Sequence, residues 1–243
     1  MPVPMYFDWT LILLIPGVIL SLWAQFKVKS TYEKYSQVAT RSGLTGAQVA
    51  QLVMENAEVK TSGGTLQPAY ATGISCPINM VPGQLTDHYD PRNRTLNLSE
   101  GVYHGRSVAA LGVAAHEVGH AIQHANAYSA LMWRNAIYPM TSISSTLSWP
   151  LLIGGLFFGI SPLLHIGIAL FSVAVLFTVI TLPVEFDASK RAIRALAHGG
   201  YLTDDEIVGA RRVLNAAAWT YVAAAAMAVL QLLRLILIAR GRD

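Results

Sequence analysis

Charged residues are scarce in this sequence. Only 13% of the 243 residues are charged, about half of the roughly 25% found in soluble globular proteins. Hydrophobic residues make up 53%, and the mean hydropathy is +0.43. This composition excludes a disordered chain and a collagen, and it leaves too little polar surface for a water-exposed protein of this size. The net charge of +3 forms no basic stripe with interleaved aromatics, so no nucleic-acid partner is expected.

Cysteine is nearly absent. The single residue, Cys76, excludes a disulfide framework and agrees with a reducing environment. We expect it to be a small apolar residue of the interior rather than a metal ligand.

Charge is missing altogether from three long stretches, which run between residues 8 and 27, 134 and 185, and 212 and 234. A hydrocarbon core of about 30 Å needs about 20 uncharged helical residues. The outer two stretches therefore predict one span each. The middle stretch is long enough for two, and its break is expected at Gly159-Ile160-Ser161-Pro162, giving spans near 140–159 and 163–183.

The charge pattern predicts a mainly α, polytopic helical membrane protein. Fourteen of the 17 lysines and arginines lie in 27–134 or 185–212, so both polar segments are expected to face the cytoplasm from the cell membrane. The predicted segments are an N-terminal transmembrane helix at 1–26, a catalytic segment at 27–134, a transmembrane hairpin at 135–184, a polar helix at 185–212, and a C-terminal transmembrane helix with its tail at 213–243.

The segment 27–134 carries clear local signals. Thr45 and Gln48 have the spacing of a capping box, and Asp90-Pro91 favours a type I turn. Ser107 is a plausible N-cap. The pattern predicts a helix over 46–57, a β-hairpin of 85–89 and 95–98, and a helix over 107–126.

The last of these helices contains His116-Glu117-Val118-Gly119-His120. Residues at i and i+4 share a helical face, so both imidazoles can bind one Zn²⁺ while Glu117 reaches a metal-bound water. Zinc would lower the pKa of that water toward about 7 and polarise a peptide carbonyl, and Glu117 would act as general base. The alternative is an apolar helix with two incidental histidines.

An open tetrahedral zinc site needs a third protein ligand. The candidates are His124, Glu185, Asp187, His88 and His104. His124 continues the i+4 series, but a straight helix spreads three such side chains over about two turns, so a surface role is expected. Glu185 is favoured by topology, because two crossings return it to the side that holds the His-Glu motif.

Over nearly its whole length, the chain resembles the YugP-type family of bacterial membrane-bound neutral zinc metallopeptidases. The resemblance is carried by the runs 85–91, 95–100, 103–110, 116–124 and 183–189. It implies a small α+β gluzincin-like domain and one Zn²⁺ per chain. It also implies His116, His120 and Glu185 as zinc ligands, Glu117 as the catalytic base, and a protein or peptide substrate.

A more distant resemblance is to HtpX-type and CAAX-type membrane proteases, which carry a Glu-Phe-x-Ala-Asp pattern. Residues 185–189 match it except at Ser189, where the family has an aspartate that supports a ligand histidine. Asp187 could orient His116 or His120, or cap the helix that follows.

Substrate contacts are less well defined by the sequence. The candidate oxyanion donors are His88, Tyr89, His104, Tyr128 and Arg134, and their spacing does not choose among them. The strand Thr95–Leu98 precedes the zinc-motif helix, and our hypothesis is that its edge binds an extended substrate.

The favoured function is a membrane-embedded zinc metalloendopeptidase that cleaves membrane-associated proteins. One alternative is a site-2-type intramembrane protease, because Glu117 is the only charge between Arg106 and Arg134. That class, however, uses an aspartate within a later apolar span. Another alternative is a membrane scaffold or chaperone subunit with structural zinc, but such sites are closed by four ligands, often thiolates, and the chain has one cysteine.

Overall fold

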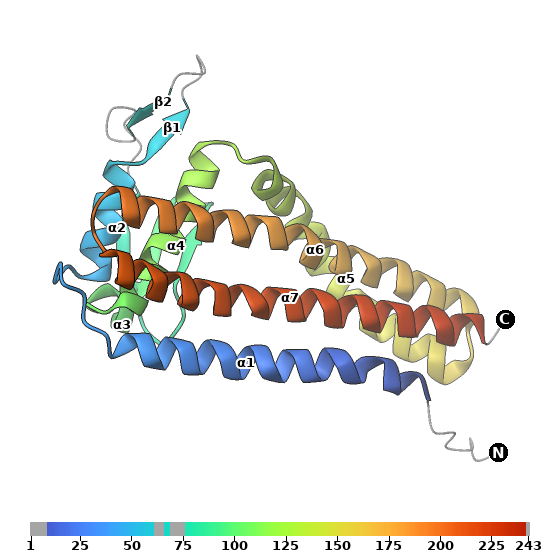
Figure 1. Cartoon of the computed structure of the whole chain (residues 1–243). Helices are drawn as coiled ribbons and strands as arrows, with labels where there is room; N and C mark the ends of the chain where they lie inside the picture. The colour runs from blue at the N-terminus through green and yellow to red at the C-terminus, as the bar shows by residue number, and fades with distance from the viewer. Residues whose placement is uncertain (1–8, 61–65, 69–75, 242–243) are drawn as a thin grey trace. The chain divides into compact units, whose positions relative to one another are not determined.

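The structure is a computed structural model that describes residues 9–60, 66–68 and 76–241 (Figure 1). The chain divides into two compact units. The first consists of Met1–Gln25, Arg134–Thr181 and Thr220–Asp243, and the second consists of Phe26–Trp133 and Leu182–Trp219.

Four long helices dominate the described residues. They are α1 (Ile15–Ser36), which follows the 3-10 helix η1 (Trp9–Leu14), α5 (Ser129–Phe158), α6 (Ser161–His198) and α7 (Asp204–Arg240). Each has the length and apolar composition to cross a membrane. The prediction of a mainly α chain with four apolar spans is confirmed.

The break between α5 and α6 lies where the sequence predicts it. Gly159 adopts a φ of 68°, a left-handed conformation that glycine tolerates without steric cost. Pro162 occupies the first turn of α6, where its missing N–H is not needed.

The first unit packs its helices through small residues. A Cβ on Gly155 would lie 2.6 Å from the backbone nitrogen of Leu164, and one on Gly167 would lie 2.8 Å from Cγ of Leu152. Leu152 and Leu164 are almost fully buried, whereas the aromatic side chain of Phe157 is 83% exposed. Exposed apolar side chains of this kind suit a lipid surrounding.

The described residues of the second unit form three further helices. Helix α2 (Gly46–Glu55) begins with the predicted capping box, in which Thr45 accepts from the Gln48 backbone and Gln48 accepts from the Thr45 backbone. Helix α3 (Glu100–Tyr103) is a single turn. Helix α4 (Val108–Ala125) begins at the predicted N-cap, Ser107, whose hydroxyl accepts from the backbone of Ala110.

Five short strands are also found in the part of the second unit that the structure describes. They are β1 (Glu58–Lys60), β2 (Leu66–Pro68), β3 (Ile78–Val81), β4 (His88–Asp90) and β5 (Thr95–Ser99). Strands β1 and β2 pair antiparallel, and the other three form a sheet of order β3-β5-β4. The predicted hairpin is confirmed as β4 and β5, which are antiparallel.

The predicted substrate-binding edge is wrong. Strand β3 pairs parallel with β5 on the side opposite β4, so both edges of β5 are already hydrogen-bonded. An extended peptide cannot be added to a strand in the middle of a sheet. The sequence did not reveal β3, because a strand of four residues is too short for an alternation of apolar and polar side chains to stand out.

Helix α4 lies at the centre of the second unit's core. Leu111 and Val118 on α4 are fully buried with Leu96 of β5 and Leu196 of α6. Burial of each such side chain contributes about 1.5–3 kcal/mol. The helix that carries the His-Glu motif is therefore held rigidly by contacts from a sheet and from another helix.

Candidate metal centre

Helix α4 presents the two motif histidines on one face. His116 and His120 are one turn apart, and their ring centroids lie 4.8 Å from each other with the planes nearly perpendicular. His120 is buried, and the side chain of His116 is 14% exposed. This pair can therefore offer two nitrogen atoms to one ion in a site with little access for water.

Helix α6 brings Glu185 to the same place. Its Oε2 lies 3.3 Å from Nε2 of His116 and 3.5 Å from Nε2 of His120. The ligand atoms of these three residues all lie within 4.8 Å of one another. Two imidazoles and one carboxylate are a donor set that suits Zn²⁺ and leave one coordination position open.

A glycine allows this close approach of the two helices. A Cβ at Gly119, between the motif histidines, would lie 2.6 Å from the carbonyl oxygen of Ala188 on α6. No ordinary side chain fits in that space. Gly119 therefore lets the backbone of α6 lie directly against α4, which carries Glu185 to the histidines.

The backs of both imidazole rings have hydrogen-bond partners. Nδ1 of His120 lies 3.0 Å from Oε1 of Gln123, and Nδ1 of His116 lies 3.1 Å from Oγ of Ser189. Partners at Nδ1 turn Nε2 toward the ion, an arrangement typical of metal-binding histidines. In both residues Nε2 is the atom that faces Glu185.

Gln123 belongs to a longer chain of contacts. The residue is fully buried, and its Nε2 donates to the Val184 carbonyl and to Oδ2 of Asp187, both at 2.8 Å. The same carboxylate oxygen accepts from Nε of Arg191 at 2.6 Å. Asp187 thus contacts the His120 side of the site through Gln123, and it lies inside α6 rather than at the start of a helix.

Glu117 is buried beside the three clustered residues but is not one of them. Its Oε2 accepts a hydrogen bond of 3.0 Å from the backbone N–H of Tyr89 on strand β4. The bond fixes the carboxylate and leaves its other oxygen available as a proton acceptor. The hydroxyl of Tyr89 contacts Nδ1 of His124 at 2.8 Å, so the strand and α4 are joined at two points.

The charge distribution of the site favours a cation. Burial lowers the pKa of His120, but the hydrogen bond and the negative charge of Glu185 outweigh that effect, and the pKa lies above its ordinary value. Positive charge is therefore stabilised between His120 and Glu185, whether a proton or a metal ion carries it.

The other histidines that the sequence offered as ligands lie elsewhere. His124 contacts Tyr89, in keeping with the expectation that it does not ligate. His88 contacts the Thr86 carbonyl and Asn97. His104 is exposed and stacks edge-on against its neighbour in sequence.

Sequence reasoning missed Gln123 and the backbone N–H of Tyr89. Gln123 could have been recognised from the sequence, because it is a polar residue three positions after His120. Residues at this spacing lie on the same face of a helix. The N–H of Tyr89 carried none, because every residue except proline has one.

Two comparisons with known proteins give matches over nearly the whole chain. The model of a family described as "Putative neutral zinc metallopeptidase" matches residues 10–240. Over 232 residues the chain is 46% identical to "Putative membrane protease YugP" of Bacillus subtilis (strain 168), and the match covers 95% of this chain and 97% of that protein. No solved structure matches the chain.

Proposed function

The chain belongs to the family of neutral zinc metallopeptidases, and we propose that it is a membrane-embedded, zinc-dependent metalloendopeptidase. His116, His120 and Glu185 would hold one Zn²⁺ per chain. The observation that carries the proposal is the convergence of their two Nε2 atoms and one carboxylate oxygen beside the buried Glu117.

Zinc in this position would supply a Lewis acid that lowers the pKa of water to about 7 and polarises a peptide carbonyl. Glu117 would take the proton from the attacking water and pass it to the leaving amine. The hydrogen bond from Tyr89 would hold the Glu117 carboxylate in place during both transfers. Ser189 and Gln123 would hold the ligand histidines with Nε2 toward the metal.

An open site favours catalysis over a structural role for the metal. Among the residues that the structure describes, the group contains three possible ligands, and no fourth histidine, cysteine or acidic residue joins them. Structural zinc sites are normally closed by four protein ligands.

We also propose the segment boundaries and the orientation that the charge pattern predicts. The catalytic segment 27–134 and the segment 185–212, which holds the end of α6 and the start of α7, would face the cytoplasm, between transmembrane segments at 1–26, 135–184 and 213–243. Substrates would then be proteins or peptides at the cytoplasmic side of the membrane, membrane-associated proteins in particular.

Metal content tests the ligand set. The detergent-purified protein should retain one zinc per chain after dialysis against dilute chelator, measured by elemental mass spectrometry. Glu185→Ala should lose most of this zinc. Glu100→Ala is the matched control, because Glu100 is an exposed glutamate on α3 outside the group, and this variant should keep the metal.

Peptide hydrolysis tests the role of Glu117. Glu117→Gln should retain zinc yet cleave an unstructured protein such as casein about 10²–10⁴-fold more slowly, which is the usual loss when a general base is removed. Full activity of this variant with bound zinc would contradict the proposal. Zinc retained in Glu185→Ala would place the third ligand at another residue.

A further inference from the structure

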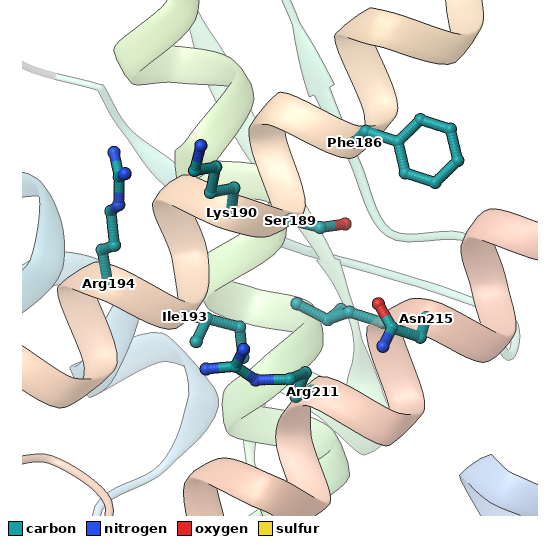
Figure 2. Close-up of a pocket in the computed structure, with 8 residues that line it drawn as sticks. Phe186, Ser189, Lys190, Ile193, Arg194, Arg211 and Asn215 are labelled. Carbon is teal, nitrogen blue, oxygen red and sulfur yellow. The ribbon is translucent and has the colours of Figure 1, made fainter.

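A cavity of about 320 Å³ lies between α6 and α7 in the second unit, and its cationic residues set it apart. The residues that line it include Lys190 and Arg194 of α6 and Arg211 and Asn215 of α7, all labelled in Figure 2. Three cationic residues from two helices therefore line one small space.

Within the described part of the chain, these cations have no acidic partner. Among the described residues, no carboxylate lies within ion-pair distance of Lys190, Arg194 or Arg211. The cations next to them in the sequence do have partners, because Arg191 pairs with Asp187 and Arg212 donates to the Tyr35 hydroxyl. Like charges that share a cavity repel each other, so an anion placed among them is stabilised.

Phe186 and Leu214 add apolar surface to the cavity near the predicted spans. Phe186, which is 48% exposed, follows the predicted span 163–183 by three residues, and the cations of α6 come one and two turns later. Along α7 the cation comes first, because Arg211 precedes the buried Leu214. Phe186 is thus the lining residue of α6 nearest the predicted span, with Ile193 between the two cations, and on α7 both Leu214 and Asn215 follow Arg211.

We propose that this cavity binds the phosphate headgroup of an anionic phospholipid. The cations and the amide of Asn215 would bind phosphate oxygens, and the first acyl carbons would lie against Phe186 and Leu214. Basic pockets at the ends of transmembrane helices commonly bind such headgroups. Free phosphate would satisfy the cations but would leave the apolar surface of the cavity without a ligand.

Lipid binding can be measured directly by native mass spectrometry of the detergent-purified protein. The probes are phosphatidylglycerol, zwitterionic phosphatidylcholine, inorganic phosphate and an acidic peptide. The test variant is the triple substitution Lys190→Gln, Arg194→Gln and Arg211→Gln. Ser189 also borders the cavity but is left intact, because its hydroxyl contacts His116.

The matched control removes the same charge from another part of the second unit. Lys27, Lys29 and Lys34 on α1 follow the first predicted span and do not line the cavity, so their triple substitution by glutamine tests general surface attraction. Each cation near a membrane surface contributes about fivefold in affinity, so the cavity variant should bind phosphatidylglycerol roughly 100-fold more weakly than the parent. The control variant should bind it nearly as well as the parent, and zinc content should be unchanged in both.

Four results would overturn the proposal. Equal losses in the two triple variants would assign binding to general surface charge. Equal binding of phosphatidylcholine and phosphatidylglycerol would remove the requirement for an anionic headgroup. Displacement of the lipid by inorganic phosphate would identify a soluble ligand, and displacement by an acidic peptide would identify the cavity as a substrate pocket. Because the readout is lipid binding, each result is independent of proteolytic activity.

Discussion

The two sides of the candidate metal centre hold their histidines in different ways. On the His120 side the partner is the buried amide of Gln123, whose Nε2 donates to two acceptors. Its Oε1 must therefore accept, so the proton on His120 lies at Nδ1. On the His116 side the partner is the Ser189 hydroxyl, which can donate or accept.

This difference matters because a metal binds the imidazole nitrogen that carries no proton. The amide on the His120 side fixes the tautomer that leaves Nε2 free, before any ion arrives. The hydroxyl on the His116 side fixes neither tautomer, so the metal or Glu185 selects it. The ordered side should therefore contribute more to zinc affinity than the adjustable side.

The largest effect is expected from Gln123→Leu. The change keeps the side-chain volume similar but leaves Nδ1 of His120 buried without a partner, at a cost of about 1–3 kcal/mol, and removes the side-chain bond to the Val184 carbonyl, which lies within α6. Zinc affinity, measured by competition with a chelator, should fall toward 100-fold, the upper part of the range for residues that support metal ligands. The unfolding temperature should fall as well.

Gln51→Leu is the control for this substitution. Gln51 lies on the exposed face of α2, and its amide donates only to Glu55 one turn away. Its loss should leave zinc affinity and the unfolding temperature almost unchanged. If the two leucine variants had equal zinc affinities, the buried amide would have no role in orienting His120.

An intermediate effect is expected from Asp187→Asn. The carboxylate accepts from Gln123 and from Arg191, and asparagine can still accept but has no charge to strengthen these bonds. Because Asp187 acts on His120 only through Gln123, zinc affinity should fall about tenfold, the equivalent of one weakened charge-assisted bond. Asp204→Asn, at an exposed position in the first turn of α7, should leave zinc affinity unchanged. A loss as large as that of Gln123→Leu would mean that Asp187 acts directly.

Much of this arrangement could be predicted from the sequence, because the signals are local. The i, i+4 spacing of His116 and His120 depends only on helical geometry. The capping box at Thr45 and the break at Gly159 are equally local. Glu185 is 65 residues from His120, yet it could be favoured because the count of intervening spans constrains the side of the membrane on which it lies.

The parts that could not be predicted depend on contacts between distant elements. Gln123 supports His120 only because α6 brings the Val184 carbonyl and Asp187 to the same amide. Strand β3 is too short to show a pattern, and its parallel pairing with β5 overturned the expected substrate edge. The small size of Gly119 is evident from the sequence, but its close contact with Ala188 follows only from the packing of two helices.

The smallest effect is expected at Ser189, where a substitution in each direction sharpens the contrast between the two sides. Ser189→Ala removes one neutral hydrogen bond from the more accessible histidine, so zinc affinity should fall only about threefold. Ser189→Asp introduces an acceptor that requires a proton on Nδ1 of His116, which fixes the tautomer as Gln123 does for His120. Zinc affinity should then equal or exceed that of the parent in the same chelator competition. Weaker binding by the aspartate variant than by the alanine variant would show that His116 does not depend on the tautomer set at this position.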